Sequence, residues 1–239
     1  MKSGDRLFSY DAIASEYATK VDSAPYNALY ERPAMLSLLP DLSGLRILDA
    51  GCGSGWYAER LLERGASVDA IDASAAMAGY ASARLATLAP GVADRVSVGV
   101  ADLGEPLPFA SGTFDGVISP LVLHYLEDWR PALREMRRIL KPQGWLQFST
   151  HHPSADAALF ETQNYFAVER VTDHWDWAGD VTFYRRSLTE IFDSLRDAEL
   201  TVERVVEPVP GAEFRQVKPD AWIKLMNRPE FLIVIARAE

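Results

Sequence analysis

Residues 46–55 read RILDAGCGSG, a short apolar run that leads into a loop with glycines at positions 51, 53 and 55. Such a stretch is typical of a β-strand that turns tightly into a helix, because glycine permits backbone conformations and close approaches that a Cβ atom would obstruct. The spacing is G-x-G-x-G and differs from the G-x-G-x-x-G of dinucleotide-binding loops. The loop therefore predicts a ligand that lies against the main chain after this strand.

Strands and helices are predicted to alternate along most of the chain. This alternation predicts an α/β fold with a mostly parallel sheet and helices on both faces. Ligands of such sheets bind beyond the carboxyl ends of the strands. Residues 1–40 are predicted to form a helical cap within a single domain of residues 1–239. The expected strands are residues 46–50, 67–72, 95–100, 114–119, 144–150, 200–206 and 231–235, and the expected helices are residues 54–63, 74–88, 127–140 and 188–198.

The composition of the 239 residues narrows the function classes. A formal net charge of −10 would repel a polyanion, so neither nucleic acid nor an anionic membrane is an expected partner. Cys52 is the single cysteine, which excludes an intrachain disulfide and a thiolate zinc site. The sequence has no apolar signal core and no apolar run near the ~18 residues that span a bilayer. A cytoplasmic monomer or homodimer is expected.

Asp49 precedes Gly51 by two positions and distinguishes between possible cofactors. A carboxylate there would repel a pyrophosphate on the helix N-terminus, but it would attract a cation. S-adenosylmethionine carries a sulfonium and an α-ammonium and no phosphate. The charge of Asp49 therefore favours S-adenosylmethionine over NAD.

Two further carboxylates follow the next predicted strands. Asp72 is placed to accept hydrogen bonds from both ribose hydroxyls. Asp102 can accept from an adenine amino group while the backbone N–H of Leu103 donates to the ring, and Met77 can pack on the adenine face. Taken singly, each carboxylate is more often a helix cap or a solvated loop residue. Three matched signals on consecutive strands favour a cofactor site.

These motifs together resemble the class I S-adenosylmethionine-dependent methyltransferases of the small-molecule type. The resemblance implies a Rossmann-like seven-stranded sheet that ends in an antiparallel pair supplied by residues 200–206 and 231–237. It also implies that Gly51, Gly53, Ala73 and Ser119 belong to the cofactor site, and that Tyr10 and Tyr17 lie in a helix over its methionine end. The matching stretches are residues 47–55, 71–74, 101–103, 107–109, 114–119 and 140–150.

Methyl transfer mainly requires alignment of the nucleophile and the methyl group, and a general base helps when the nucleophile must lose a proton. His124 follows the predicted strand 114–119 and is the candidate base; the alternative is that it shapes the loop or lines the methionine pocket. His151 and His152 follow the next strand, and either could face the acceptor. No metal site is expected.

Residues 151–186 hold 7 of the 25 aromatic residues and predict a lid over the acceptor, although a satellite core or a dimer contact would have the same composition. The predicted activity is methyl transfer from S-adenosylmethionine to an aromatic or apolar small molecule, on oxygen, nitrogen or carbon. The alternatives are a methyltransferase of RNA or protein, a non-catalytic S-adenosylmethionine-binding regulator, and an NAD oxidoreductase.

Overall fold

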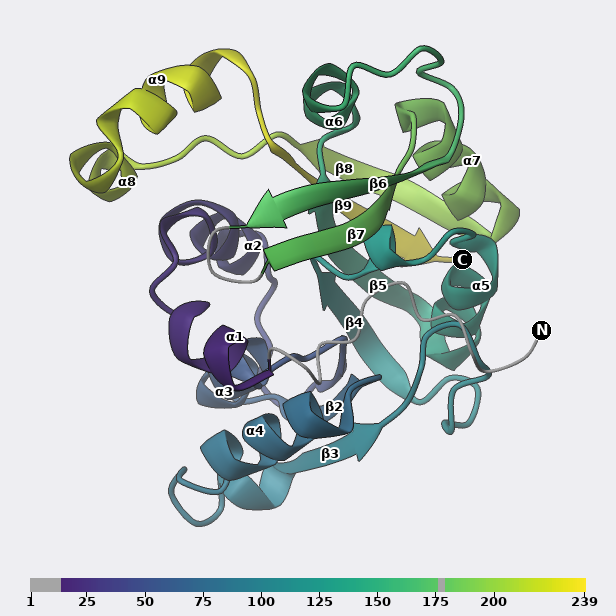
Figure 1. Cartoon of the computed structure of the whole chain (residues 1–239). Helices are drawn as coiled ribbons and strands as arrows, with labels where there is room; N and C mark the ends of the chain where they lie inside the picture. The colour runs from purple at the N-terminus through teal and green to yellow at the C-terminus, as the bar shows by residue number, and fades with distance from the viewer. Residues whose placement is uncertain (1–13, 176–178) are drawn as a thin grey trace.

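The computed structural model describes residues 14–175 and 179–239 and contains a seven-stranded sheet in the order β3-β2-β1-β4-β5-β9-β8 (Figure 1). The strands β3, β2, β1, β4 and β5 are parallel to one another, whereas β9 is antiparallel to both β5 and β8. The prediction of a Rossmann-like, mostly parallel sheet is confirmed. Its strands are β1 (Arg46–Ala50), β2 (Ser67–Asp72), β3 (Val96–Val100), β4 (Phe114–Pro120), β5 (Leu140–His151), β8 (Leu200–Val206) and β9 (Phe231–Ala238).

Helices cover both faces of the sheet, because alternate side chains of the buried strands point to opposite sides. Leu48 and its neighbours face α5 and α7, whereas Ile47 and its neighbours face α2, α3 and α4. The helices and helical turns are α1 (Ala14–Lys20), η2 (Asn27–Glu31), α2 (Arg32–Ser37), α3 (Trp56–Glu63), α4 (Ala75–Leu85), η3 (Ala93–Arg95), η4 (Leu123–Tyr125), α5 (Arg130–Ile139), α6 (Pro153–Leu159), α7 (Leu188–Asp197), α8 (Ala212–Val217) and α9 (Pro219–Asn227).

The boundaries of some elements differ from the predicted ones. The helix predicted over residues 127–140 begins at Arg130, since Pro131 fits only its first turn. Strand β5 starts at Leu140 and is longer than predicted. The helix predicted to run to residue 88 ends at Leu85. No helix in the described ranges is long and apolar enough to cross a membrane.

Residues 151–186 have a secondary structure that the sequence did not predict. They contain α6 and a hairpin of β6 (Glu169–Trp175) and β7 (Gly179–Arg185), which pair as a separate two-stranded sheet (Figure 1). Val181 and Phe183 on β7 are fully buried and pack with Phe160 and Trp175. The aromatic residues of the segment thus form, in part, the satellite core that was the alternative to a lid.

A glycine and a tryptophan on adjacent strands show how closely the sheet is packed. Gly116 on β4 lies opposite Trp145 on β5, and a Cβ atom at position 116 would lie 2.3 Å from the indole ring. Trp145 is buried and belongs to the core on that face. The indole therefore occupies the volume that a side chain at position 116 would need.

We expect Gly116→Ala to lower the free energy of unfolding by roughly 1–3 kcal/mol, because the added methyl group overpacks the core. Gly99→Ala in β3 is the matched control, since the nearest atom to its Cβ would be 4.0 Å away. The control should stay within about 1 kcal/mol of the wild type. Denaturant unfolding measures both, and equal stability of the two variants would contradict the packing argument.

Candidate functional site

The glycine loop is fastened to the end of β2 by its own backbone. Gly51 and Cys52 both donate their N–H groups to the Ile71 carbonyl, at 2.8 and 2.9 Å. Gly51 has a φ of 86°, and a Cβ atom there would lie 2.3 Å from the Val122 side chain. The loop is therefore in direct contact with the segment that follows β4.

Asp72 also fixes this loop. Its Oδ2 accepts from the Gly53 backbone N–H at 2.8 Å, and its Oδ1 accepts from the Ser74 N–H at 2.9 Å. Ser74 is the N-cap of α4, and its hydroxyl accepts from the Met77 N–H at 3.1 Å. Ala73 lies between Asp72 and Ser74 in the chain. Through these two bonds, the Asp72 side chain joins the glycine loop to the start of α4.

Asp49 is fully buried at the end of β1, and neither of its oxygens has a hydrogen-bond partner within the described part of the chain. Burial raises the pKa of its carboxyl to about 7; the Asp72 charge acts in the same direction, and the nearby Ala58 backbone opposes them. A buried carboxyl without partners is costly, so a cationic ligand with N–H donors would satisfy it. These residues fit the α-ammonium end of S-adenosylmethionine.

The other residues predicted to bind the cofactor lie in a turn, in the core, in the sheet and in a helix. Asp102 Oδ1 accepts from the Gly104 N–H at 2.9 Å in the turn after β3, and the Leu103 side chain is part of the core. Ser119 is fully buried and donates its hydroxyl to the Ala50 carbonyl at 2.9 Å, which ties β4 to β1. Tyr17 lies in α1. The prediction for Tyr10 lies outside the described residues.

A cavity of about 900 Å³ adjoins the carboxyl ends of β4 and β5. His124, from the turn after β4, and His151, the last residue of β5, both line it. Its other lining residues come from the segment after α1, from the turn after β4, from α6, from the β6–β7 hairpin and from the region of α9 and β9. They include Tyr26, Leu121, Tyr125, Asp156, Trp175, Phe183, Lys218, Arg228 and Phe231.

The two histidines form a stacked pair. Their ring centroids are 4.3 Å apart with an interplanar angle of 19°. Burial, with smaller contributions from His151 and Arg186, holds the pKa of His124 well below 6.5, and burial lowers the pKa of His151 to about 4. Neither ring nitrogen of His124 has a partner among the described residues. Both imidazoles are therefore neutral near pH 7.

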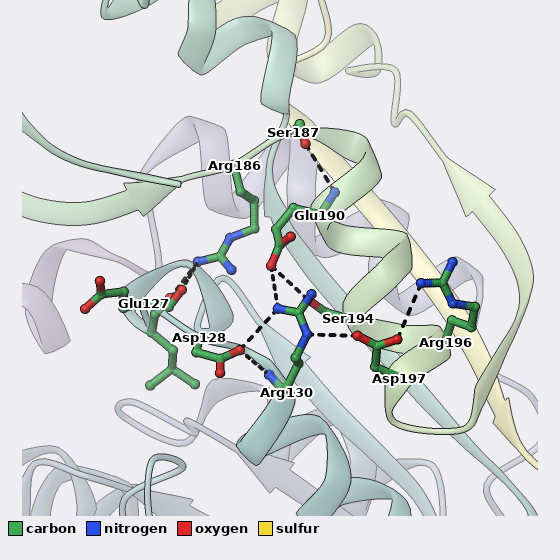
Figure 2. A network of polar contacts seen from close by, with 10 residues as sticks. Glu127, Asp128, Arg130, Arg186, Ser187, Glu190, Ser194, Arg196 and Asp197 are labelled. Atoms are coloured by element: carbon green, nitrogen blue, oxygen red, sulfur yellow. Dashed lines mark hydrogen bonds and ion pairs between the residues drawn. The ribbon is translucent and has the colours of Figure 1, made fainter. Parts of the chain in front are cut away.

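A polar network holds the turn that carries His124 (Figure 2). Arg186 donates to the Leu126 carbonyl at 2.6 Å and lies 4.2 Å over the ring of Trp129. Next to it, Arg130 pairs with Glu190 of α7 at 2.6 Å. The start of α5, the turn after β4 and α7 are thereby joined.

Two buried carboxylates were not singled out from the sequence. Glu31 accepts from the Tyr57 hydroxyl at 2.7 Å and from the Ser149 hydroxyl at 2.6 Å, so it links the helical cap to α3 and β5. Asp156 lines the cavity in the first turn of α6. Contacts between distant segments position Glu31, whereas Asp156 is positioned by a short helix directly after β5 that the sequence did not predict. The described residues contain no group of three or more His, Cys, Asp or Glu that could hold a metal ion.

Comparisons with known proteins agree with this geometry. Residues 48–148 match the family described as Methyltransferase domain. An uncharacterized protein of Haemophilus influenzae is 27% identical over an alignment of 227 residues, which covers 88% of this chain and 88% of the relative. The malonyl-[acyl-carrier protein] O-methyltransferase of Erwinia pyrifoliae is 41% identical over 142 residues, or 58% of this chain and 51% of that relative. The chain thus spans about half the length of that methyltransferase.

Among solved structures, the S-adenosylmethionine-dependent methyltransferase of Mesorhizobium loti has a TM-score of 0.69 at 27% identity. The alignment covers 91% of this chain and 99% of the other.

We expect Asp49→Asn to stabilise the ligand-free protein at pH 8. A carboxyl whose pKa rises from 3.8 to about 7 on folding binds a proton that the unfolded chain releases, so its contribution to stability falls as pH rises through this range. The amide of the variant removes that penalty. The free energy of unfolding should therefore rise by roughly 1–4 kcal/mol at pH 8 and change little below pH 4.

Asp69→Asn is the control, because Asp69 pairs with Arg46 at 2.8 Å on the neighbouring strand. Denaturant unfolding at pH 4, 6 and 8 measures both variants. A gain that is independent of pH would contradict the assignment.

Proposed function

The chain carries a class I S-adenosylmethionine-dependent methyltransferase domain, and we propose that the protein methylates a small molecule with an aromatic or apolar body. One observation carries the proposal. Asp49, whose carboxyl has no hydrogen-bond partner among the described residues, and the aromatic-lined cavity are connected through a single contact. Gly51 packs on Val122, and Val122 is two positions before His124 in the cavity. A donor held on the glycine loop would therefore have its reactive end next to the cavity.

The donor is proposed to bind along the carboxyl ends of β1, β2 and β3. Asp49 receives the α-ammonium group, Gly51 and Gly53 provide close backbone approach, and Asp72 accepts from the ribose hydroxyls. Around the adenine we place Ala73, Met77, Asp102 and Leu103, and at the methionine end Tyr17 and Ser119. S-adenosylmethionine supplies the methyl group on a cationic sulfur.

The cavity is proposed to hold the acceptor so that its nucleophilic atom faces that methyl group. In the transfer, the acceptor's lone pair forms a bond to the methyl carbon, and the carbon–sulfur bond breaks with its electrons going to sulfur. His124 would contact the acceptor as a neutral hydrogen-bond partner. The prediction that His124 is the base stays untested. Neither of its ring nitrogens has a partner among the described residues that would position it as a base, which favours an orienting contact.

Much of the cavity wall lies outside the family match. That match covers residues 48–148 and includes His124, whereas α6, the β6–β7 hairpin and the segment before β9 line the cavity beyond it. A cavity of about 900 Å³ with aromatic walls suits a metabolite-sized ligand. Those features favour a small molecule over an RNA or a protein.

The experiment that tests this function is calorimetric titration with S-adenosylhomocysteine and with NAD, followed by mass spectrometry of a metabolite panel incubated with S-adenosylmethionine. Binding of S-adenosylhomocysteine and a gain of one methyl group in a small molecule are expected. Binding of S-adenosylhomocysteine with methylation of only RNA or protein would contradict the proposal. Binding with no methylation at all would favour a regulator.

S-adenosylhomocysteine should bind roughly fivefold or more tightly at pH 7.5 than at pH 6. The reason is that Asp49, with a pKa of about 7, must release its proton to receive the ammonium group. Asp49→Asn should bind weakly and without this dependence, and Asp69→Asn should behave like the wild type. Titration in two buffers of different ionisation enthalpy measures the released proton.

Trp175→Ala should raise the acceptor KM roughly tenfold, equivalent to about 1.4 kcal/mol, while donor affinity is unchanged. Trp175 lines the cavity from the end of β6. The control is Phe166→Ala in the same segment, because Phe166 is 71% exposed and does not line the cavity. A loss of donor affinity in the folded Trp175 variant would show that the segment does not serve the acceptor. Trp177, one of the seven aromatic residues of segment 151–186 and predicted to serve the acceptor in the same way, lies outside the described residues.

A further inference from the structure

A histidine and a carboxylate lie side by side in the wall of the cavity. His151 ends β5, and Asp156 lies in the first turn of α6. His151 Nδ1 is 3.7 Å from Asp156 Oδ1, and both residues line the cavity. Asp156 is 7% exposed, so its carboxyl group is largely shielded from water.

Local structure brings these two residues together. His152 is the N-cap of α6: its Nδ1 accepts from the Ser154 N–H at 3.2 Å, and Pro153 occupies the first helical position. The helix therefore begins directly after β5, and one turn later the chain returns Asp156 to His151. The His152 N–H donates to the Glu230 carbonyl at 2.9 Å, which anchors this junction to the segment before β9.

Aromatic neighbours fix the plane of the His151 ring. It stacks on the His124 ring with 4.3 Å between ring centroids. It packs perpendicular to the Phe183 ring, with a centroid distance of 4.5 Å and an interplanar angle of 89°. Nδ1 is the ring nitrogen within ion-pair range of Asp156, and a proton on Nδ1 would leave the lone pair on Nε2. The position of the ring is therefore set before any acceptor binds.

We propose that His151 is the general base of this enzyme, that Asp156 positions it, and that the acceptor is methylated on a hydroxyl group. The proposal rests on the proposed function. As the oxygen attacks the methyl carbon, its proton passes to His151 Nε2, and the Nδ1–H of the resulting imidazolium donates to the Asp156 carboxylate. The carbon–sulfur bond electrons leave with sulfur, which departs neutral.

The chemistry of possible acceptors selects the hydroxyl. A neutral amine has a free lone pair and attacks without a base, and a carboxylic acid is already ionised near pH 7. A phenol, with a pKa of about 10, keeps its proton at that pH and gains most from a base. A preformed histidine–carboxylate pair in an aromatic cavity therefore fits a phenol or a related hydroxyl compound.

The charges that face Asp156 come from three further elements. Arg185 on β7 lowers its pKa, Asp173 on β6 and Glu230 beside β9 raise it, and burial is the largest cause of a value of about 7. Burial also lowers the pKa of His151 to about 4. Ionisation of Asp156 makes the pair competent, so the rate should rise with pH through about 7.

Nitrogen-15 NMR of the histidine rings tests the pair without any acceptor. In the wild type, His151 should stay neutral from pH 5 to 8 with its proton on Nδ1, and its ring shifts should respond to a titration near pH 7. Asp156→Asn should abolish that response. Asp180→Asn is the matched control, because it breaks the exposed pair of His174 and Asp180, at 2.8 Å, and should leave the His151 signals unchanged. A proton on Nε2, or a response that persists in Asp156→Asn, would overturn the pairing.

Kinetics test the base, with catechol, 4-nitrophenol, aniline and benzoate as probe acceptors. Only the two phenols should be methylated. His151→Gln should lower kcat about 10²–10⁴-fold. Asp156→Asn should lower kcat and remove the rise of the pH–rate profile near pH 7, with the acceptor KM little changed. Asp156→Glu should restore part of the rate. Methylation of aniline or benzoate alone, no methylation of any probe, or a normal pH profile in Asp156→Asn would overturn the proposal. Failure of the wild type to bind S-adenosylhomocysteine would instead overturn the proposed function, which the NMR result does not depend on.

Discussion

The attachment of the glycine loop to the end of β2 is the constraint on which the rest of the site depends. Gly51 and Cys52 share one carbonyl oxygen of Ile71, and Gly53 is held by the Asp72 carboxylate. Backbone donors used in this way hold the loop in a single conformation. That conformation leaves Asp49 buried beneath the loop and brings the loop against the segment after β4. The proposed donor position and the start of the proposed acceptor cavity consequently depend on the same few bonds.

The donor and acceptor halves of the molecule are built differently. The donor half uses the ends of adjacent parallel strands, where the sheet itself sets the geometry. The acceptor half draws its walls from segments far apart in the chain, including α6, the β6–β7 hairpin and the segment before β9. Arg186 and the Arg130–Glu190 pair couple the two, because they hold the turn between β4 and α5 (Figure 2). Such an arrangement allows acceptor specificity to vary over a constant donor site.

The sequence was sufficient for the main sheet. Its seven strands were predicted because their apolar runs are short and separated by turns. The assignment of Asp49 to a donor site stays a prediction, and it rests on a charge that distinguishes an ammonium from a phosphate. The β6–β7 hairpin was missed. In β6, ERVTDHW, half-buried and exposed positions alternate, but the half-buried positions include both charged and apolar residues and so form no clear apolar face. The proximity of Asp156 to His151 follows from a helix that begins directly after β5, and the unpartnered ring of His124 follows from tertiary burial. Neither has a signature in local sequence.

The place of β9 in the sheet also has a consequence for the order in which the chain folds. β9 inserts between β5 and β8, and Phe231 at its start contributes to the cavity wall. Until it arrives, β5 presents an unpaired edge in the middle of the future sheet, and such edges recruit other chains. Contacts this distant in sequence form slowly, because a long loop must close first. The sheet therefore stays incomplete until β9, the last strand of the chain, pairs between β5 and β8.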